Sequence, residues 1–188
     1  VWYEVRRTGG GTGWVGGYYV TEYRAPKDFC ADAAPKELIK TFGQAFIAQD
    51  GETLGKLVSP LHGMTVRLFR NGTAVNYLWY APVLFKSDYR VNWGAPHGSL
   101  KPVVAAFPDA FTPRLQSVFK SEYTLACNDA AMVSSPGVSP WPPEYANINY
   151  YAVTKPASAD GKEKASTWLI GVDFVDGEPH IFAIIFFP

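Results

Sequence analysis

Cys30 and Cys127 are the side chains of this chain best suited to chemistry, because a thiolate can act as a nucleophile, bind a metal ion or form a disulfide. The short sequences around them, DFCAD and LACND, match neither an Asp-Cys-Ser/Ala-Gly lead into a helix nor a Ser-His-Gly-Cys run, the two contexts in which we would expect a nucleophilic thiol. Their wide separation also differs from a redox motif or a zinc site, and only three histidines are present. We therefore expect no thiol enzyme and no metal site.

A disulfide between the two cysteines is the simplest interpretation, and two buried free thiols that pack as small apolar side chains are the alternative. The bond would close a loop of about 100 residues, for which the loss of chain entropy predicts roughly 4 to 5 kcal/mol of stabilisation. Structural disulfides persist in oxidising compartments. The pair therefore favours an extracytoplasmic protein, which is secreted, periplasmic or held at the cell surface.

The acids and the other histidines form no coherent catalytic set. Residues 173–180 contain three acids and a histidine, but their Asp176-Gly177 pair predicts a tight turn rather than a group of metal ligands. His97 lies in a loop between proline and glycine, where functional side chains concentrate, although a solvent-facing histidine is the simpler interpretation. No two carboxylates belong to a common element as glycoside hydrolysis requires. We expect no catalytic residue and no cofactor.

Aromatic residues are more numerous than a core of this size requires, and exposed rings stack on sugars or anchor protein contacts. Those beyond the N-terminal segment are Trp79, Tyr80, Tyr89, Trp93, Trp141, Tyr150, Tyr151 and Trp168. Core packing accounts for most of these rings. For the remainder we expect a binding surface centred on the loops of Trp93 and Trp141, with His97 close to the first of them.

The overall composition excludes several classes of partner. Lys plus Arg and Asp plus Glu are both 17, so the chain has no net field that would attract nucleic acid or an anionic membrane. A hydrophobic fraction of 47% is typical of a globular protein rather than a disordered one. The longest apolar runs, such as Ile181 to Phe187, have the length of a strand and not of a membrane span.

Residues 1–23 have the pattern of a strand, a glycine-rich turn and a returning strand. Trp2 to Arg7 alternates with a period of two, Gly9 to Gly13 supplies residues that tolerate positive φ, and Gly13 to Val20 contains the second strand. With its Gly-Thr-Gly-Trp-Val and Tyr-Val runs, this segment resembles the last two strands of bacterial SH3 (SH3b) domains.

That resemblance implies a module for attachment, with Trp2, Trp14 and Tyr19 as its binding residues. The earlier strands and the long loop that help to form the ligand groove of that family are missing here. Half a barrel is not stable alone. We therefore expect the hairpin to dock on the following domain, to be completed by another chain, or to continue a barrel encoded before Val1.

Residues 24–34 are expected to form a connector, and residues 35–188 an α+β domain. Amphipathic spacing, the prolines and the Asn-Gly and Asp-Gly pairs place its elements. These are helices over 35–49 and 54–58, a hairpin of 64–70 and 73–80 around Asn71-Gly72, a helix over 114–119 with Pro113 at its first position, a strand over 122–127, a stiff exposed proline-rich loop over 134–144, and a terminal meander of 145–154, 167–175 and 180–187.

Helices followed by hairpins and a terminal meander predict a curved antiparallel sheet wrapped on a helix. The domain also resembles the cone-shaped NTF2-like fold. That family's Phe-x-x-Ala, Asp and Leu-x-x-Leu-Val pattern is matched by Phe42 and Ala45, by Asp50, and by Leu54 to Val58. The expected architecture is thus a partial SH3-like β-module followed by an NTF2-like α+β domain.

Our leading hypothesis is a non-catalytic, extracytoplasmic binding or cell-surface protein. The N-terminal module would attach it to a cell-wall glycan or peptide or assist assembly, and the α+β domain would contact a ligand or another protein subunit. One alternative is an NTF2-like enzyme with a small-molecule pocket, in which Asp109 or His97 would act as the acid or base. Another is a structural subunit whose partial module is completed by a second copy.

Overall fold

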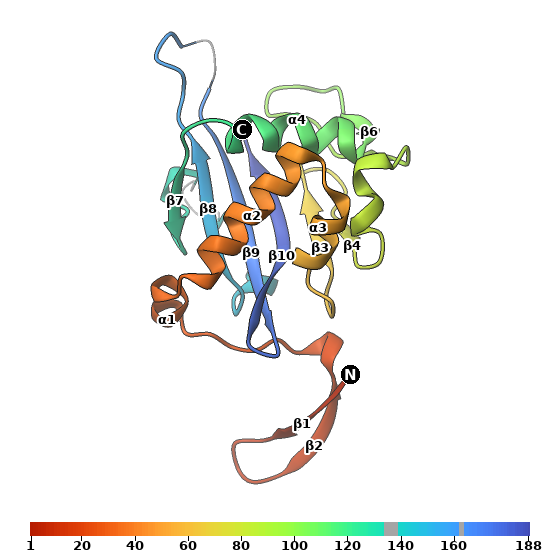
Figure 1. The fold of residues 1–188 in the computed structure, drawn as a ribbon, viewed down its shortest axis with the longest axis vertical. Helices are drawn as coiled ribbons and strands as arrows, with labels where there is room; N and C mark the ends of the chain where they lie inside the picture. The colour runs from red at the N-terminus through yellow and green to blue at the C-terminus, as the bar shows by residue number, and fades with distance from the viewer. Residues whose placement is uncertain (134–138, 162–163) are drawn as a thin grey trace.

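The computed structural model describes residues 1–133, 139–161 and 164–188, and within these ranges the chain forms a mixed α+β structure (Figure 1). Its centre is a curved, six-stranded sheet with the strand order β4-β3-β10-β9-β8-β7. Strand pairs β1-β2 and β5-β6 form two further small sheets. Residues 134–138, the first part of the expected proline-rich loop, lie outside the described ranges.

The elements have the following bounds. The α-helices are α1 (Pro26–Ala31), α2 (Ala34–Ala48), α3 (Gly51–Leu57) and α4 (Phe107–Phe119). The strands are β1 (Trp2–Arg6), β2 (Thr12–Gly16), β3 (Met64–Arg67), β4 (Val75–Tyr77), β5 (Arg90–Asn92), β6 (Val104–Ala106), β7 (Thr124–Cys127), β8 (Asn149–Lys155), β9 (Ser166–Val175) and β10 (Glu178–Phe187). Short 3₁₀ turns are η1 (Gly17–Tyr19), η2 (Ala81–Lys86), η3 (Ala131–Val133) and η4 (Pro143–Tyr145).

Helix α2 confirms the helix expected over 35–49 to within one residue at each end. Pro35 lies in its first turn, where a missing N–H costs nothing, and Gln49 ends the helix with a left-handed φ of 54°. Asp50 then caps α3, because its side chain accepts a hydrogen bond from the main-chain nitrogen of Thr53 at 3.0 Å. The buried face of α2 consists of Pro35, Leu38, Ile39, Phe42, Gly43, Ala45 and Phe46.

The expected C-terminal meander is confirmed, with β8, β9 and β10 antiparallel in chain order. Asp176 and Gly177 both have positive φ, 53° and 81°, as the tight turn between β9 and β10 requires. The other edge of β10 pairs in parallel with β3, which pairs antiparallel with β4. A register shift between Ile181 and Ala183 interrupts the β9-β10 ladder, and such irregularities bend and twist the strand.

The hairpin expected over 64–80 is present, but its turn is not the one that the sequence predicts. Met64 of β3 faces Tyr77 of β4, and residues 68–74 connect the two strands. A Cβ atom on Gly72 would lie 2.0 Å from the carbonyl oxygen of Trp93. Asn71-Gly72 therefore serves as a close contact between two loops, for which only glycine leaves room.

Three further segments differ from the expected pattern. Helix α4 begins at Phe107 rather than at Pro113, because Pro108 occupies its first turn and Pro113 lies inside the helix. The connector over 24–34 contains helix α1, again with a proline in the first turn. Strand β2 ends at Gly16 and a 3₁₀ turn follows, so residues 17–20 leave the hairpin instead of extending it.

The space between helices α2 and α4 and the sheet is filled by side chains. The rings of Phe107 and Phe111 are stacked with centroids 4.8 Å apart, and Trp93 meets Phe111 edge-on at 4.8 Å. Trp168 of β9 approaches Phe111 at 5.8 Å, and all four rings are buried. This aromatic packing is the main core of the domain.

A smaller apolar layer covers the opposite face of the sheet. Trp141 lies against the backbone of Gly171, where a Cβ atom would be 2.6 Å from the indole ring. Ile148, Leu169 and Ile185 belong to the same cluster. Because Gly171 has no side chain, the indole of Trp141 can pack directly against the backbone of β9. Residues 139–144 of the expected proline-rich loop are therefore packed on the sheet rather than exposed along their whole length.

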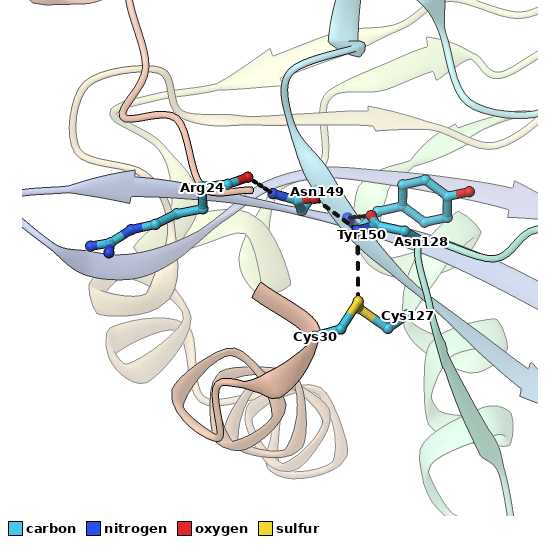
Figure 2. The surroundings of a disulfide bond; sticks show 6 residues. All are labelled: Arg24, Cys30, Cys127, Asn128, Asn149 and Tyr150. Carbon is cyan, nitrogen blue, oxygen red and sulfur yellow. Dashed lines mark hydrogen bonds between the residues drawn. A yellow bond between two sulfur atoms is a disulfide. The ribbon is translucent and has the colours of Figure 1, made fainter. Parts of the chain in front are cut away.

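The expected disulfide between Cys30 and Cys127 is present and joins α1 to the end of β7, with 5.7 Å between the Cα atoms. Beside it, the Asn128 amide donates to the side-chain oxygen of Asn149 at 2.7 Å (Figure 2). The Asn149 amide in turn donates to the carbonyl oxygen of Arg24 at 2.8 Å. These bonds tie the chain before α1 to strand β8. Among the described residues, no helix is long and apolar enough to cross a bilayer.

Candidate functional site

The N-terminal hairpin stands apart from the main sheet, at the lower end of the molecule in Figure 1. In its register Trp2 faces Gly16 and Trp14 faces Glu4, so the two indoles occupy diagonal positions on one face. Both are 68% exposed. Arg6 shares that face, because side chains alternate along a strand. We refer to Trp2, Glu4, Arg6 and Trp14 as the tryptophan face.

On the other face of the hairpin, Tyr3 contacts the body of the protein near the root, while Val5 remains 39% exposed. Tyr3 packs over Gly17, where a Cβ atom would lie 2.9 Å from the phenol ring and 3.4 Å from a methyl group of Leu61. The main-chain nitrogen of Gly17 donates to the carbonyl oxygen of Val1 at 2.9 Å. Glycine is therefore required at the root of the hairpin, where the chain turns toward the sheet.

Residues 17–25, which we call the strap, connect the hairpin to α1 and run along the lower end of β8, β9 and β10 (Figure 1). The Glu22 carboxylate accepts from the main-chain nitrogen of Gly177 at 3.1 Å, in the β9-β10 turn. The Arg24 guanidinium lies 4.7 Å from the centre of the Phe174 ring, in a cation–π contact. These contacts hold the strap on the sheet on either side of a buried polar cluster.

Asp173 of β9 is the centre of that cluster and is 1% exposed. One carboxylate oxygen accepts from His62 Nδ1 at 2.5 Å and from Ser59 Oγ at 2.7 Å. The other accepts from the hydroxyl of Thr21 in the strap. His62 Nε2 lies 3.1 Å from the carbonyl oxygen of Gly17, also in the strap. A single buried carboxylate therefore joins the strap, the segment after α3 and the sheet.

The electrostatics of the cluster favour an ion pair. The hydrogen bond to Asp173 raises the pKa of His62, against the opposing effect of burial. Burial alone would raise the pKa of Asp173, but the bonds from His62, Thr21 and Ser59 together hold it below its ordinary value. Because both ring nitrogens of His62 face acceptor oxygens, the doubly protonated imidazolium satisfies both of them.

Ser59, His62 and Asp173 have the residue types of a hydrolytic triad, but not its geometry. In a triad the second imidazole nitrogen faces the serine hydroxyl. Here that nitrogen faces the Gly17 carbonyl, and Ser59 Oγ donates to the same Asp173 oxygen that His62 contacts. The cluster therefore supports the strap and offers no nucleophile. Within the described ranges, no three His, Cys, Asp or Glu side chains are grouped to hold a metal ion.

The chain is similar to an NTF-2 like protein. That solved structure, from Silicibacter pomeroyi DSS-3, is described as of unknown function. The similarity covers 87% of this chain and 98% of that chain, with 12% sequence identity and a TM-score of 0.39. No model of a known protein family matches the chain, and neither does any curated protein.

The residues expected to bind a partner divide into two groups. Trp2, Trp14 and Tyr19 are exposed, Tyr19 at 81%, and the hairpin and its root bring them to one end of the molecule. Trp93 and Trp141 are instead buried, at 0% and 8% exposure. The two loops that we expected to present indole rings to solvent turn these rings inward.

The indole nitrogens explain this second arrangement. Trp93 Nε1 donates to the carbonyl oxygen of Ala105 at 2.9 Å, and Trp141 Nε1 donates to that of Tyr145 at 2.9 Å. A loop tryptophan whose N–H finds a main-chain acceptor can bury its whole ring at little cost. His97 and Asp109 are both exposed, His97 in the loop after Trp93 and Asp109 in the first turn of α4.

Sequence reasoning did not find the contact between His62 and Asp173, which are separated by 111 positions. The only local signal is the place of Asp173 within the apolar run of β9, where every residue from Thr167 to Val175 is buried. A charged residue in such a strand needs a partner. The sequence does not say which one.

Proposed function

We propose that this protein is a non-catalytic binding protein that acts outside the cytoplasm and attaches to a cell-wall polymer through the tryptophan face of its N-terminal hairpin. The observation that carries the proposal is the pair of indoles at Trp2 and Trp14, each 68% exposed on one face of a hairpin that stands off the main sheet. The α+β domain serves as the body to which the strap fixes this module.

The chemistry of the face suits an anionic glycan. Indole rings stack on the apolar faces of sugars. Arg6 lies on the same face, and Arg7 follows it at the turn, while Glu4 is the acid among these positions. The two guanidinium groups would complement carboxylate or phosphate groups carried by a wall polymer. As part of this proposal, residues 1–23 form an SH3b-like module.

Two features of the α+β domain support a role without catalysis. Aromatic rings fill the space between the helices and the sheet, where an NTF2-like enzyme would keep its pocket. The Ser59, His62 and Asp173 cluster is directed at the strap. We also propose that this α+β domain is NTF2-like. The disulfide favours an oxidising compartment and thus an extracytoplasmic site of action.

Co-sedimentation with purified peptidoglycan tests the proposal. We expect the wild type to sediment with the wall, and W14A to be lost from the pellet. The matched control is W79A, because Trp79 is also a surface tryptophan, 78% exposed, but belongs to the α+β domain. Retention of W14A at the wild-type level would contradict the proposal, as would a wild type that stays in solution.

The same variants distinguish attachment from self-assembly. If the hairpin were completed by a second copy, light scattering would give a dimer for the wild type and a monomer for W14A, since hydrophobic strand edges favour pairing. A strict monomer at the concentrations used for sedimentation excludes that arrangement. If the wild type is a dimer and W14A is a monomer, the role of the hairpin is self-assembly rather than attachment to the wall.

A further inference from the structure

A cleft of about 800 Å³ lies at the carboxyl ends of the parallel strands β3 and β10. These strand ends are at the end of the molecule opposite to the hairpin (Figure 1). Its apolar surface comes from the partly exposed Phe186 and Phe187 and from the neighbouring prolines, and Ile185 lies in register with Arg67. Arg67, Arg70 and His97 also line it. A cleft of this volume is within the range that binds drug-sized molecules.

The walls of the cleft are fixed by contacts between two loops. The side-chain oxygen of Asn71 accepts from the main-chain nitrogen of Ala95 at 3.0 Å, and Thr73 N donates to the Asn92 carbonyl oxygen at 3.0 Å. The close approach of Gly72 to Trp93 joins the same loops. The main chain next to Arg70 and close to His97 is therefore held in place before any ligand arrives, which lowers the entropic cost of binding.

The charges of the cleft are unbalanced. Neither Arg67 nor Arg70 makes an ion pair or a side-chain hydrogen bond within the part of the chain that the structure describes. Glu144 has the acidic side chain among the lining residues, and Pro188, the last residue of the given sequence, also lines the cleft. Arg67 is half-buried at the end of β3, next to the apolar floor. Two guanidinium groups beside phenyl rings would recognise an anionic group that carries an apolar one.

We infer that this cleft binds a small organic anion, a carboxylate or phosphate monoester that carries an aromatic or aliphatic group. The anionic end contacts Arg67 and Arg70, and the apolar part lies on Phe186 and Phe187, which are both partly exposed. The site is separate from the tryptophan face, so it does not depend on the function proposed for the hairpin.

Titration of the folded protein with four probes, followed by NMR or calorimetry, tests this inference. Phenyl phosphate and phenylacetate carry both parts of the expected ligand, inorganic phosphate carries only the charge, and benzyl alcohol carries only the ring. We expect at least one of the first two to bind at least tenfold more tightly than either of the last two. The better of the two aromatic anions identifies phosphate or carboxylate as the preferred group.

The variants R70Q and R67Q/R70Q should weaken binding of that aromatic anion at least tenfold. The matched control is K36Q, which removes an exposed positive charge from helix α2, outside the cleft, and it should bind as the wild type does. Arg70 is exposed and has no described side-chain partner, so R70Q retains the fold, which near-UV circular dichroism checks.

Three results would overturn the inference. These are no saturable binding of either aromatic anion up to 10 mM probe, equal binding of benzyl alcohol, and wild-type affinity in R67Q/R70Q. W14A should bind the anion normally, so a failure here and a failure of wall attachment are separate outcomes.

Discussion

Asp173→Asn perturbs the polar cluster beneath the strap with almost no change in volume. The asparagine keeps one oxygen that can accept from Ser59 or Thr21, but it removes the negative charge that faces His62. The side chain of Asp173 is 0% exposed and that of His62 only 10%, so water cannot replace the lost partner. The imidazole must then give up its proton or remain charged without a counter-ion.

The expected cost follows from the burial of the pair. Removal of one partner from a buried ion pair costs about 3 to 5 kcal/mol, because an uncompensated charge remains. The asparagine oxygen and the loss of a proton from His62 relieve part of this. We therefore expect the free energy of unfolding to fall by about 3 kcal/mol at pH 6, measured by chemical denaturation. Asp176→Asn, which removes an exposed acid from the turn beyond β9, is the matched control and should be nearly neutral.

The pH dependence provides a second, signed measurement. The pKa of His62 is raised in the folded protein, so its contribution to stability is complete below the ordinary pKa of 6.5 and is lost as pH rises through the raised value. The pKa of Asp173 is lowered, so its contribution is present above 3.8 and is lost as pH falls through the lowered value. The pair should therefore stabilise the fold most strongly between about pH 4 and 6.5.

His180, which faces Asp173 across the β9-β10 ladder, acts in the opposite direction. Burial lowers the pKa of His180, so its contribution is present above pH 6.5 and is lost as pH falls. His180 is present in both the wild type and H62Q, so its contribution cancels when their free energies of unfolding are subtracted. That difference should decline as pH rises above 6.5. A difference that is flat or grows with pH, or a loss below about 1 kcal/mol in D173N, would refute the ion pair.

Three further perturbations have defined outcomes. Reduction of the disulfide, or Cys30→Ser with its partner also changed to serine, should lower the free energy of unfolding by roughly 4 to 5 kcal/mol, since 97 positions separate the cysteines. Gly72→Ala should cost about 3 kcal/mol in chemical denaturation, whereas Gly13→Ala, where no atom lies within 4 Å of the new Cβ, should cost under 1 kcal/mol. Trp93→Phe should cost about 1 to 2 kcal/mol more than Trp168→Phe, because the Trp93 indole N–H has a hydrogen-bond partner among the described residues and that of Trp168 has none; equal losses would contradict this.

The parts of the fold that could be predicted are those whose signals are local. Helix α2 has its proline, its apolar spacing and its end within 16 residues, and the Asp176-Gly177 turn is fixed by two adjacent residues. The disulfide follows from a count of two cysteines. None of these predictions requires knowledge of which distant segments pack together in the folded protein.

The parts that could not be predicted depend on distant partners. Asn71-Gly72 has the strongest local signal for a two-residue turn, yet the close packing of Gly72 on Trp93 decides its role. Trp93 and Trp141 are buried because main-chain oxygens of neighbouring segments accept their N–H groups. The chemical type of these residues is readable in the sequence, but exposure is a property of the tertiary packing.

The candidate site also combines local and distant contacts. These contacts explain how the hairpin keeps the tryptophan face exposed instead of packing it against the α+β domain. The polar contacts of this region belong to the strap, where Gly17, Thr21 and Glu22 are held by His62, by Asp173 and by the β9-β10 turn. The tryptophan face makes none of these bonds. Because the root is fixed and Tyr3 covers it from the other side, the indoles remain directed at solvent. If the hairpin attaches as proposed, a module fixed in this way would lose little conformational freedom on binding a polymer, and the stability of the strap would set how well the face is presented.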